Sequence, residues 1–288
     1  MNYISAKEVE KNPTLDEIVE PENDLKNMLV EYVGEKLSPE DNSVTVAMIV
    51  DVLAAEFPEF VMVLAEENWI RRRKSLDSRL INGIQVHVKD ALPQNIDIEA
   101  IVGSITLKLP AHILELVDVV YIGEFHFLEE KQANAVYLDG AIYTTNKQDN
   151  DGDMLDDLLH EYAHATEKNY NVQIYSDNAI ESEFLSKRLK LGTLLDYEGY
   201  DVGEYNFSNP DYDINFDIFL HNEVGYEKIR NLDQGMFLNS YSITSLSEYF
   251  ATSFEEYYLR NRRLVKKITP AAYAKIDLIH RGDIEYDH

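Results

Sequence analysis

The hydrophobic pattern divides the chain into helical and strand-forming stretches. Between Thr45 and Leu80, apolar residues recur at intervals of three and four, which predicts buried helices, and Pro58 predicts a break between two of them. From about residue 82 the pattern alternates instead. This alternation predicts strands in "NGIQVHVKD", "VDVVYIGEFHF" and "NAVYLDGAIYTTN", the last being two strands joined through an Asp139-Gly140 turn.

Helical patterns return after this β-rich stretch. They cover "MLDDLLHEYAHATEKNY", "SEFLSKRLKLGTLLDYEGY", "FLHNEVGYEKIRNL" and "SLSEYFATSFEEYYLRNRRLV", with a tyrosine-rich, loop-like segment before the third. Helices, then a small sheet, then further helices predict an α+β fold, and we expect the sheet to be mostly antiparallel and packed on helices.

The chain is also expected to contain two regions of different character. Residues 1–80 are predicted to form a helical N-terminal extension suited to docking, and residues 82–288 the main domain. A tyrosine-rich insertion is expected at about residues 171–240. Two interpretations of it stay open: its tyrosines shape a binding site, or they pack in ordinary surface loops. The packing interpretation is preferred.

The composition argues against several classes of function. The formal net charge is −27, from 53 acidic and 26 basic residues, and such a surface repels nucleic-acid backbones. The absence of cysteine excludes disulfides and thiolate metal ligands. No apolar run approaches the ~20 residues of a membrane span, and the N-terminus lacks a signal-peptide pattern. We therefore expect a cytoplasmic or virion-associated protein that binds no nucleic acid, with secretion by a non-classical route left open.

The strongest chemical motif is HExxH, formed by His160, Glu161 and His164. Residues four apart on a helix share one face, with Cβ atoms about 5–6 Å apart, so both imidazoles can bind one metal ion. Zinc accepts imidazole nitrogen, and a catalytic zinc site keeps one position for water. Glu161 lies about 100° further around the helix, where it can take a proton from that water. The motif therefore predicts a Zn²⁺ site with Glu161 as general base, and a chance match on an ordinary amphipathic helix is the alternative.

A catalytic zinc site needs a third protein ligand, and the sequence leaves this ligand open. Position 170 is Tyr170, so the chain lacks the HExxHxxGxxH arrangement, and a carboxylate from a later helix is favoured. Glu183 follows His164 at a spacing found in some glutamate-zinc peptidases. Glu248 follows Ser245 at capping-box spacing, which is an ordinary structural role. The candidates by spacing are Glu181, Glu183, Glu248, Glu255 and Glu256.

Two segments together resemble a known family. "DLLHEYAHA", followed by "YSITSLSEYFATSF", is similar to the catalytic domain of the anthrax lethal factor-like metallopeptidases, which include the Pro-Pro endopeptidases. In that family a loop tyrosine precedes a ligand glutamate by seven residues, and Tyr241 and Glu248 stand at this spacing. The hairpin "AVYLDGAIYTT" fits the edge strand along which the family's substrate lies. The resemblance covers about residues 82–283, although residues 165–247 form a longer stretch than is usual and Thr252 replaces a common acidic residue.

The resemblance implies a zincin-like metallopeptidase fold with Zn²⁺ bound by His160, His164 and Glu248. It implies that Glu161 acts as general base and that Tyr241 donates a hydrogen bond to the oxyanion formed during peptide hydrolysis. The expected function is a zinc-dependent endopeptidase acting on a polypeptide substrate. The alternative is a structural or assembly protein, such as a bacteriophage virion component, that carries a metallopeptidase-like domain and docks on a partner protein through residues 1–80.

Overall fold

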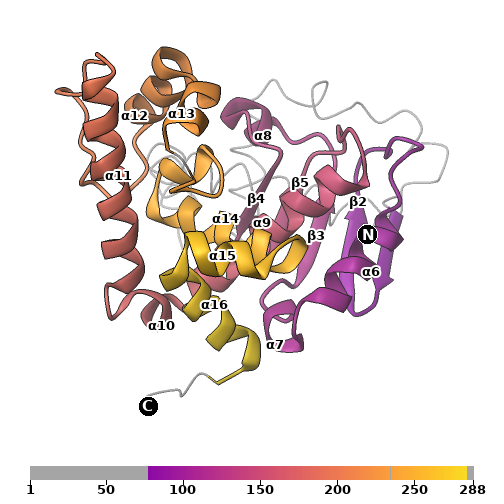
Figure 1. Cartoon of the computed structure of the whole chain (residues 1–288). Coiled ribbons are helices and arrows are strands. Elements are labelled where there is room, and N and C mark those ends of the chain that lie inside the picture. The colour runs from indigo at the N-terminus through magenta and orange to yellow at the C-terminus, as the bar shows by residue number, and fades with distance from the viewer. Residues whose placement is uncertain (1–76, 234, 284–288) are drawn as a thin grey trace, which may run out of the picture. The chain divides into compact units, whose positions relative to one another are not determined.

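The computed structural model describes residues 77–233 and 235–283 (Figure 1). The helices predicted from Thr45 onwards and the docking role predicted for residues 1–80 fall outside the described residues, except at Asp77–Leu80. Contacts divide the chain into two units, one made of residues 79–124 and 133–288, and the other of residues 1–78 and 125–132. The first unit carries the HExxH motif.

The first unit contains a five-stranded sheet in the order β1-β2-β3-β5-β4. Two of its pairings, β2 with β3 and β3 with β5, are parallel, whereas β4 pairs antiparallel with β5. The prediction of an α+β fold is confirmed, but the prediction of a mostly antiparallel sheet is wrong. The strands are β1 (Asp77–Ile81), β2 (Ile84–Val88), β3 (Val119–Ile122), β4 (Ala135–Leu138) and β5 (Ala141–Thr144).

A helical connection explains the parallel pairing: its second helix lies in "LPAHILELV", which the sequence predicts to be a short helix, whereas its first helix was not predicted. Between β2 and β3 the chain forms α6 (Ile98–Lys108) and α7 (Ala111–Leu114), a crossover of the kind that parallel neighbours require. Asp97 caps α6 by accepting a hydrogen bond from the Ala100 amide. The apolar positions of α6 follow helical spacing and are buried at Ile98, Ile101, Val102 and Ile105.

Tight turns fix the two ends of the sheet. Asn82 (φ 50°) and Gly83 (φ 94°) connect β1 to β2, so the helical pattern predicted up to Leu80 stops early and its last residues form a strand instead. Asp139 (φ 43°) and Gly140 (φ 90°) connect β4 to β5, which confirms the predicted hairpin. Positive φ at both turn positions matches the right-handed twist of the flanking strands.

The second unit is described only at residues 77–78, the start of β1, and at residues 125–132, which contain α8 (His126–Lys131). The sequence predicted a β-rich run through this point, and the prediction is wrong beyond Ile122. The physical reason is visible in the burial pattern. Glu124 and His126 are exposed while Phe125 and Phe127 are buried, so the sequence alternates as a strand does although the backbone becomes helical.

The C-terminal half of the first unit is almost entirely helical (Figure 1). Its two central helices, α9 and α14, pack against each other, and α9 also contacts β4 and β5. The elements are α9 (Asp151–Asn169), α10 (Asn171–Tyr175), α11 (Ala179–Tyr197), α12 (Ile214–Ile218), the π-helix η1 (Phe219–Val224), α13 (Tyr226–Leu232), the 3₁₀ turn η2 (Tyr241–Ile243), α14 (Leu246–Leu259), α15 (Arg262–Ile268) and α16 (Pro270–Arg281).

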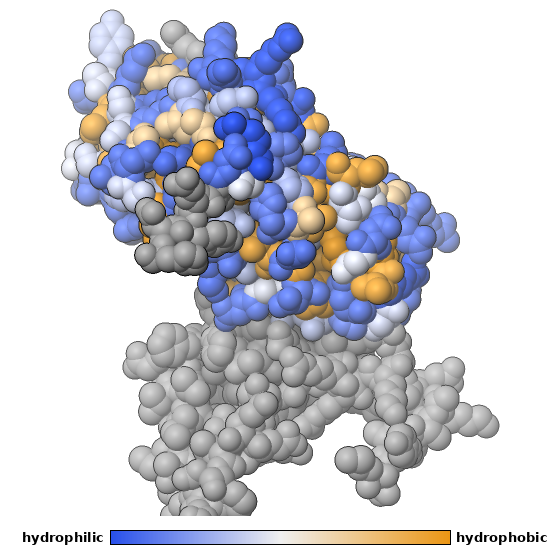
Figure 2. Space-filling view, turned by 90° about the horizontal axis from the view of Figure 1, so that it is seen from below, coloured by the Kyte–Doolittle hydropathy of each residue, from blue (hydrophilic) through white to orange (hydrophobic). Residues whose placement is uncertain are grey.

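The surface agrees with the acidic, polar composition. Hydrophilic residues cover most of the described part of the face that Figure 2 shows, and hydrophobic residues gather in smaller areas. Within the described residues, every helix is too short or too polar to cross a bilayer.

Candidate metal centre

The HExxH motif lies in the middle of α9, as predicted. Asn150 starts this helix, because its side-chain oxygen accepts hydrogen bonds from the Gly152 and Asp153 amides at 2.8 and 3.1 Å. Acidic residues in the first turn interact favourably with the helix dipole. Leu158, Leu159 and Tyr162 are fully buried beside the motif, so packing holds the helix firmly on both sides of the histidines.

Helix α14 brings Glu248 to the same place from a distant part of the sequence. Ser245 is the N-cap of α14, and its hydroxyl accepts a hydrogen bond from the Glu248 amide at 3.1 Å. In a complete capping box the Glu248 carboxylate would turn back to the Ser245 amide. Instead the carboxylate points at the two histidines of α9, which leaves the ordinary structural role only half fulfilled.

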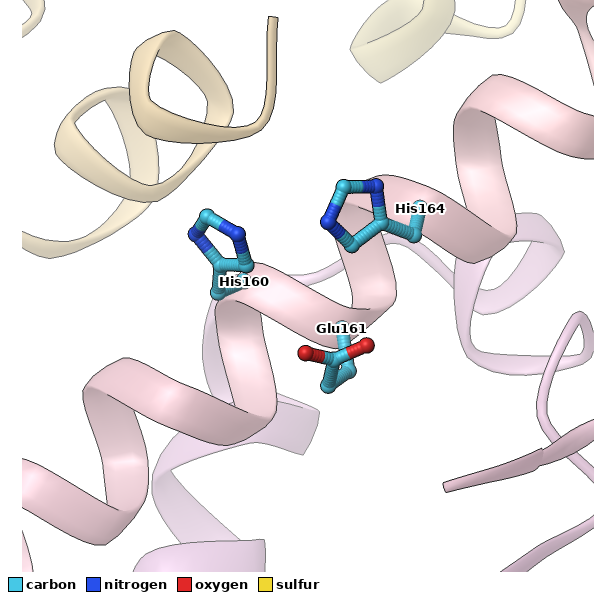
Figure 3. Close-up of side chains that lie close together, drawn as sticks. All are labelled: His160, Glu161 and His164. Atoms are coloured by element: carbon cyan, nitrogen blue, oxygen red, sulfur yellow. The ribbon is translucent and has the colours of Figure 1, made fainter. Parts of the chain in front are cut away.

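The three side chains converge through specific atoms. Glu248 Oε2 lies 3.0 Å from His160 Nε2, and Glu248 Oε1 lies 3.7 Å from His164 Nε2. The two imidazole rings lie side by side on α9, with centroids 4.9 Å apart and planes at 75° (Figure 3). All three side chains are largely buried, with exposed fractions of 18, 24 and 15%.

These distances fit a tetrahedral metal site. Zinc binds nitrogen and oxygen at about 2.0–2.2 Å, and tetrahedral geometry then places neighbouring ligand atoms about 3.4 Å apart. The two measured distances from the Glu248 carboxylate to the imidazole Nε2 atoms fall on either side of that value. The nitrogen and oxygen donors are also of the type that zinc accepts.

Two further carboxylates contact the opposite ring nitrogens. Glu255 Oε2 lies 3.5 Å from His160 Nδ1, and Glu167 Oε2 lies 3.4 Å from His164 Nδ1. The Ser247 hydroxyl donates to the same oxygen of Glu167. Metal-binding histidines commonly donate their second ring N–H to a carboxylate, which fixes the ring orientation and leaves the other nitrogen free for the metal.

Helical periodicity alone could have identified these outer carboxylates. Glu167 follows His164 by one turn of α9, and Glu255 follows Glu248 by two turns of α14, so each lies on the face that carries the ligands. The sequence reading named Glu255 only as a candidate ligand and did not name Glu167.

Glu161 occupies the neighbouring face of α9 (Figure 3). Its carboxylate, His160 and His164 offer potential ligand atoms within 4.8 Å of one another. One interaction holds the carboxylate in place, a hydrogen bond with the backbone of Tyr137 on β4. Its Oε2 atom is buried and has no hydrogen-bond partner. Burial raises the pKa of Glu161, which suits a group that must accept a proton near neutral pH.

Glu161 could itself be taken for the third metal ligand, because it belongs to the same His-Glu-His group. Glu248 is the better candidate. Its two oxygens approach the Nε2 atoms of both histidines, whereas the Glu161 carboxylate is held by the strand beside the helix. Glu161 therefore lies beside the ligand set.

The electrostatic field of the centre is strongly negative. Burial alone would lower the pKa of His160, but the hydrogen bonds with Glu248 and Glu255 outweigh it and raise the pKa to about 10. For His164 the carboxylates of Glu167, Glu161 and Glu248 likewise outweigh burial and raise the pKa. Without another cation, the site holds protons on its histidines.

Tyr241 lies at the start of η2, seven residues before Glu248, and its side chain is 41% exposed. Burial of its hydroxyl, together with the negative charge of Glu248, raises the pKa of Tyr241 well above the ordinary value. The hydroxyl therefore keeps its proton at neutral pH and is available as a hydrogen-bond donor.

Glu183, the main rival ligand, has other partners. Its Oε1 accepts a hydrogen bond from the Tyr249 hydroxyl at 2.6 Å, and its Oε2 accepts one from the Ala271 amide at 2.9 Å. Both oxygens are thus occupied in the packing of α11 against α14 and α16. Of the other candidates, Glu256 pairs with Arg260 at 3.4 Å.

Comparisons of the chain with protein-family models, with curated proteins and with solved structures return no match. The resemblance to the lethal factor-like metallopeptidases therefore stays a prediction, and the functional argument depends on the geometry of the centre formed by α9 and α14.

Proposed function

We propose that this protein is a zinc-dependent endopeptidase in which His160, His164 and Glu248 bind the metal. The observation that carries the proposal is the convergence of both Nε2 atoms on the Glu248 carboxylate, while Glu255 and Glu167 contact the Nδ1 atoms. A cluster built only for packing would not need this division between inner and outer ring nitrogens.

A bound zinc ion would supply Lewis acidity, lowering the pKa of a water molecule and polarising the scissile carbonyl. The role of Glu161 follows from its position beside the ligands. Its raised pKa and unpartnered Oε2 support the role of general base, which takes a proton from the attacking water and delivers it to the leaving amine.

Tyr241 is proposed to stabilise the developing oxyanion. Its hydroxyl stays protonated because burial and the Glu248 charge raise its pKa, and a protonated phenol can donate a hydrogen bond to negative oxygen. The exposure of its side chain lets it reach a substrate. Tyr241 would therefore increase the rate of the chemical step.

The strand β4 is the proposed guide for the polypeptide. It is the last strand in the described sheet order, and its residue Tyr137 hydrogen bonds through the backbone with Glu161. An extended peptide can add to such an edge through main-chain hydrogen bonds. This arrangement would bring the scissile bond close to the general base.

The proposal is tested by measuring metal content and cleavage together. The purified full chain is expected to contain close to one equivalent of zinc by mass spectrometry and to cleave members of a peptide library. In Glu161→Gln the zinc should remain while cleavage falls by about 10²-fold or more, since only the proton transfer is lost.

A matched control is Glu256→Gln, on α14 but bonded to Arg260 and not to a histidine. It should keep both zinc and cleavage. Failure of the unmodified protein to bind zinc, or full activity in Glu161→Gln, would contradict the proposal.

A further inference from the structure

The tyrosine-rich insertion exposes an apolar surface close to the candidate metal centre. Most large apolar side chains of the described residues are buried, but four exposed ones lie between residues 212 and 241. They define the insertion surface, with their exposed fractions: Tyr212 (49%), Ile214 (57%), Ile218 (46%) and Tyr241 (41%).

Helix α12 presents this surface in a fixed orientation. Ile214, Asp217 and Ile218 are three and four residues apart, so they share one face of the helix. Phe216 points the other way and is buried, where the guanidinium of Arg188 stacks on its ring at 4.2 Å. The exposed isoleucines are therefore held outward by a well-anchored helix.

Asp217 ties two tyrosines of the insertion together. The Tyr212 hydroxyl donates to Asp217 Oδ2 at 2.8 Å, and the Tyr226 hydroxyl donates to Asp217 Oδ1 at 2.9 Å. Both acceptor atoms of the carboxylate are used, so the aromatic side chains have defined positions.

Two hydrogen bonds attach the insertion to the elements that carry Tyr241 and Glu248. The Leu246 amide donates to the Pro210 carbonyl at 2.8 Å, which fixes the chain two residues before Tyr212 to the first turn of α14. The Ser240 hydroxyl donates to the Tyr226 carbonyl at 3.1 Å, one residue before Tyr241. These two hydrogen bonds therefore hold the insertion surface against the segments that carry Tyr241 and Glu248.

The insertion as a whole contains the basic residues Lys187, Arg188, Lys190, Lys228 and Arg230, but the segment that carries α12 is purely acidic, and its charge indicates what the insertion surface would bind. Residues 201–223 contain no Lys or Arg, and their acidic residues are Asp201, Glu204, Asp211, Asp213, Asp217 and Glu223. An exposed apolar surface surrounded by carboxylates is complementary to a large apolar side chain with basic neighbours.

We propose that the insertion surface binds the polypeptide substrate next to the scissile bond and selects a large apolar side chain flanked by Lys or Arg. The proposal deepens the endopeptidase function and rests on it. In this proposal, the choice of substrate depends on the insertion surface and not on the HExxH helix α9.

The test uses the full, zinc-containing chain and an unbiased peptide library whose cleavage sites are read by mass spectrometry. Sites with a large apolar residue and a nearby Lys or Arg should dominate the products. For the best such peptide, Ile214→Ser/Ile218→Ser should lower kcat/KM by about tenfold or more, chiefly through KM, because apolar contact area with the substrate is lost. Its zinc content should not change.

The matched control is Leu107→Ser, an apolar position on α6 that is more exposed than either isoleucine, with an exposed fraction of 89%. It should leave kcat/KM unchanged. Asp211→Asn/Asp213→Asn should reduce the preference for basic neighbours and weaken the dependence of kcat/KM on salt, since screened attraction contributes less.

The outcomes separate this proposal from the function on which it rests. No cleavage by the unmodified protein overturns the endopeptidase function and the substrate class together. Cleavage without the apolar and basic preference, or an Ile214→Ser/Ile218→Ser variant that behaves like Leu107→Ser, overturns the substrate class alone.

Discussion

Two neighbouring residues of α14 enter two very different polar clusters. Glu248 faces α9 and meets His160 and His164, whereas Tyr249 faces α11 and meets Glu183 and Lys187. We call these the histidine cluster and the lysine cluster. Both are largely buried, both join segments far apart in the sequence, and both contain carboxylates.

The two clusters differ in how their charge is balanced. In the lysine cluster, the Lys187 ammonium donates to the Tyr249 hydroxyl and the Ile268 carbonyl and lies 3.8 Å from Glu183. The partners of Glu183 are complete, so the cluster needs nothing more to be stable.

The histidine cluster is incomplete by the same standard. Among the described residues, Glu255 pairs with Arg260 at 3.0 Å, but no Lys or Arg forms an ion pair with Glu161, Glu167 or Glu248, and Glu161 Oε2 has no hydrogen-bond partner. The charge of Glu167 and Glu248 is balanced only by the protons that the two histidines hold, and a divalent cation could replace those protons. The comparison separates a cluster in which both oxygens of Glu183 have partners from one that keeps a buried carboxylate oxygen, Glu161 Oε2, without a partner.

Mutations in the two clusters should therefore affect different properties, zinc binding in one and stability in the other, and this is the largest expected effect. Glu248→Ala should weaken zinc binding by about a thousandfold or more, because one of three protein ligands is lost. Glu183→Ala should retain zinc but lower the free energy of unfolding by about 1–3 kcal/mol, because Lys187 and the Tyr249 hydroxyl lose a buried partner. Competition with a zinc chelator and chemical denaturation measure the two effects. Zinc loss in Glu183→Ala with retention in Glu248→Ala would reverse the assignment.

The pH dependence of the metal-free protein gives the next effect, on the order of a few kcal/mol in the free energy of unfolding. Hydrogen bonds with carboxylates, opposed by burial, raise the pKa of His160 to about 10, and the pKa of His164 is raised as well. A raised pKa in the folded state stabilises that state fully below the unfolded value of 6.5. The stabilisation is lost as the pH rises towards 10.

Chemical denaturation at pH 6 and pH 9 checks this prediction. The metal-free protein should be less stable at pH 9, and Glu248→Gln should reduce the difference because the main acceptor of His160 is neutralised. Zinc affinity should change in the other direction and rise with pH, since zinc must displace the same protons. A metal-free protein that becomes more stable between pH 6 and pH 9 would contradict the assigned contacts.

A smaller effect is expected at the outer carboxylates of the histidine cluster. Glu167→Gln and Glu255→Gln should each lower zinc affinity by about 10–100-fold, because the acceptor that orients each ring would lose its negative charge. Glu256→Gln is the matched control, since Glu255 and Glu256 both pair with Arg260 but only Glu255 also contacts His160. Chelator competition distinguishes the three variants. Equal affinity in all three would mean that the outer carboxylates do not position the histidines.

The same comparison shows how far the sequence could lead. The HExxH spacing predicted that His160 and His164 share a helical face, because that is a local property of α9. The choice between Glu183 and Glu248 is not local. It depends on how α11 and α14 rotate when they pack, and spacing along the chain carries no information on that rotation.

The same holds for the fold: features with a local sequence signature could be predicted, and features that depend on distant contacts could not. The Asp139-Gly140 hairpin and the Ser245 cap have local signatures, and both are present. The helix α6 was missed, and with it the crossover that makes the sheet partly parallel. The alternating pattern of residues 124–127 is that of a strand, and only its environment makes the chain helical there.

The smallest expected effect separates the two roles that the sequence offered for Glu248. Ser245→Ala removes the hydroxyl that accepts from the Glu248 amide, so it should cost about 1 kcal/mol of stability through loss of the α14 cap. Zinc affinity should change little, because the carboxylate of Glu248 bonds to histidines and not to the cap. If Glu248 were only a capping residue, Ser245→Ala and Glu248→Ala would lower stability alike and neither would affect zinc. A stability loss without zinc loss in Ser245→Ala, together with zinc loss in Glu248→Ala, can arise only if the backbone of Glu248 serves the helix and its side chain serves the metal.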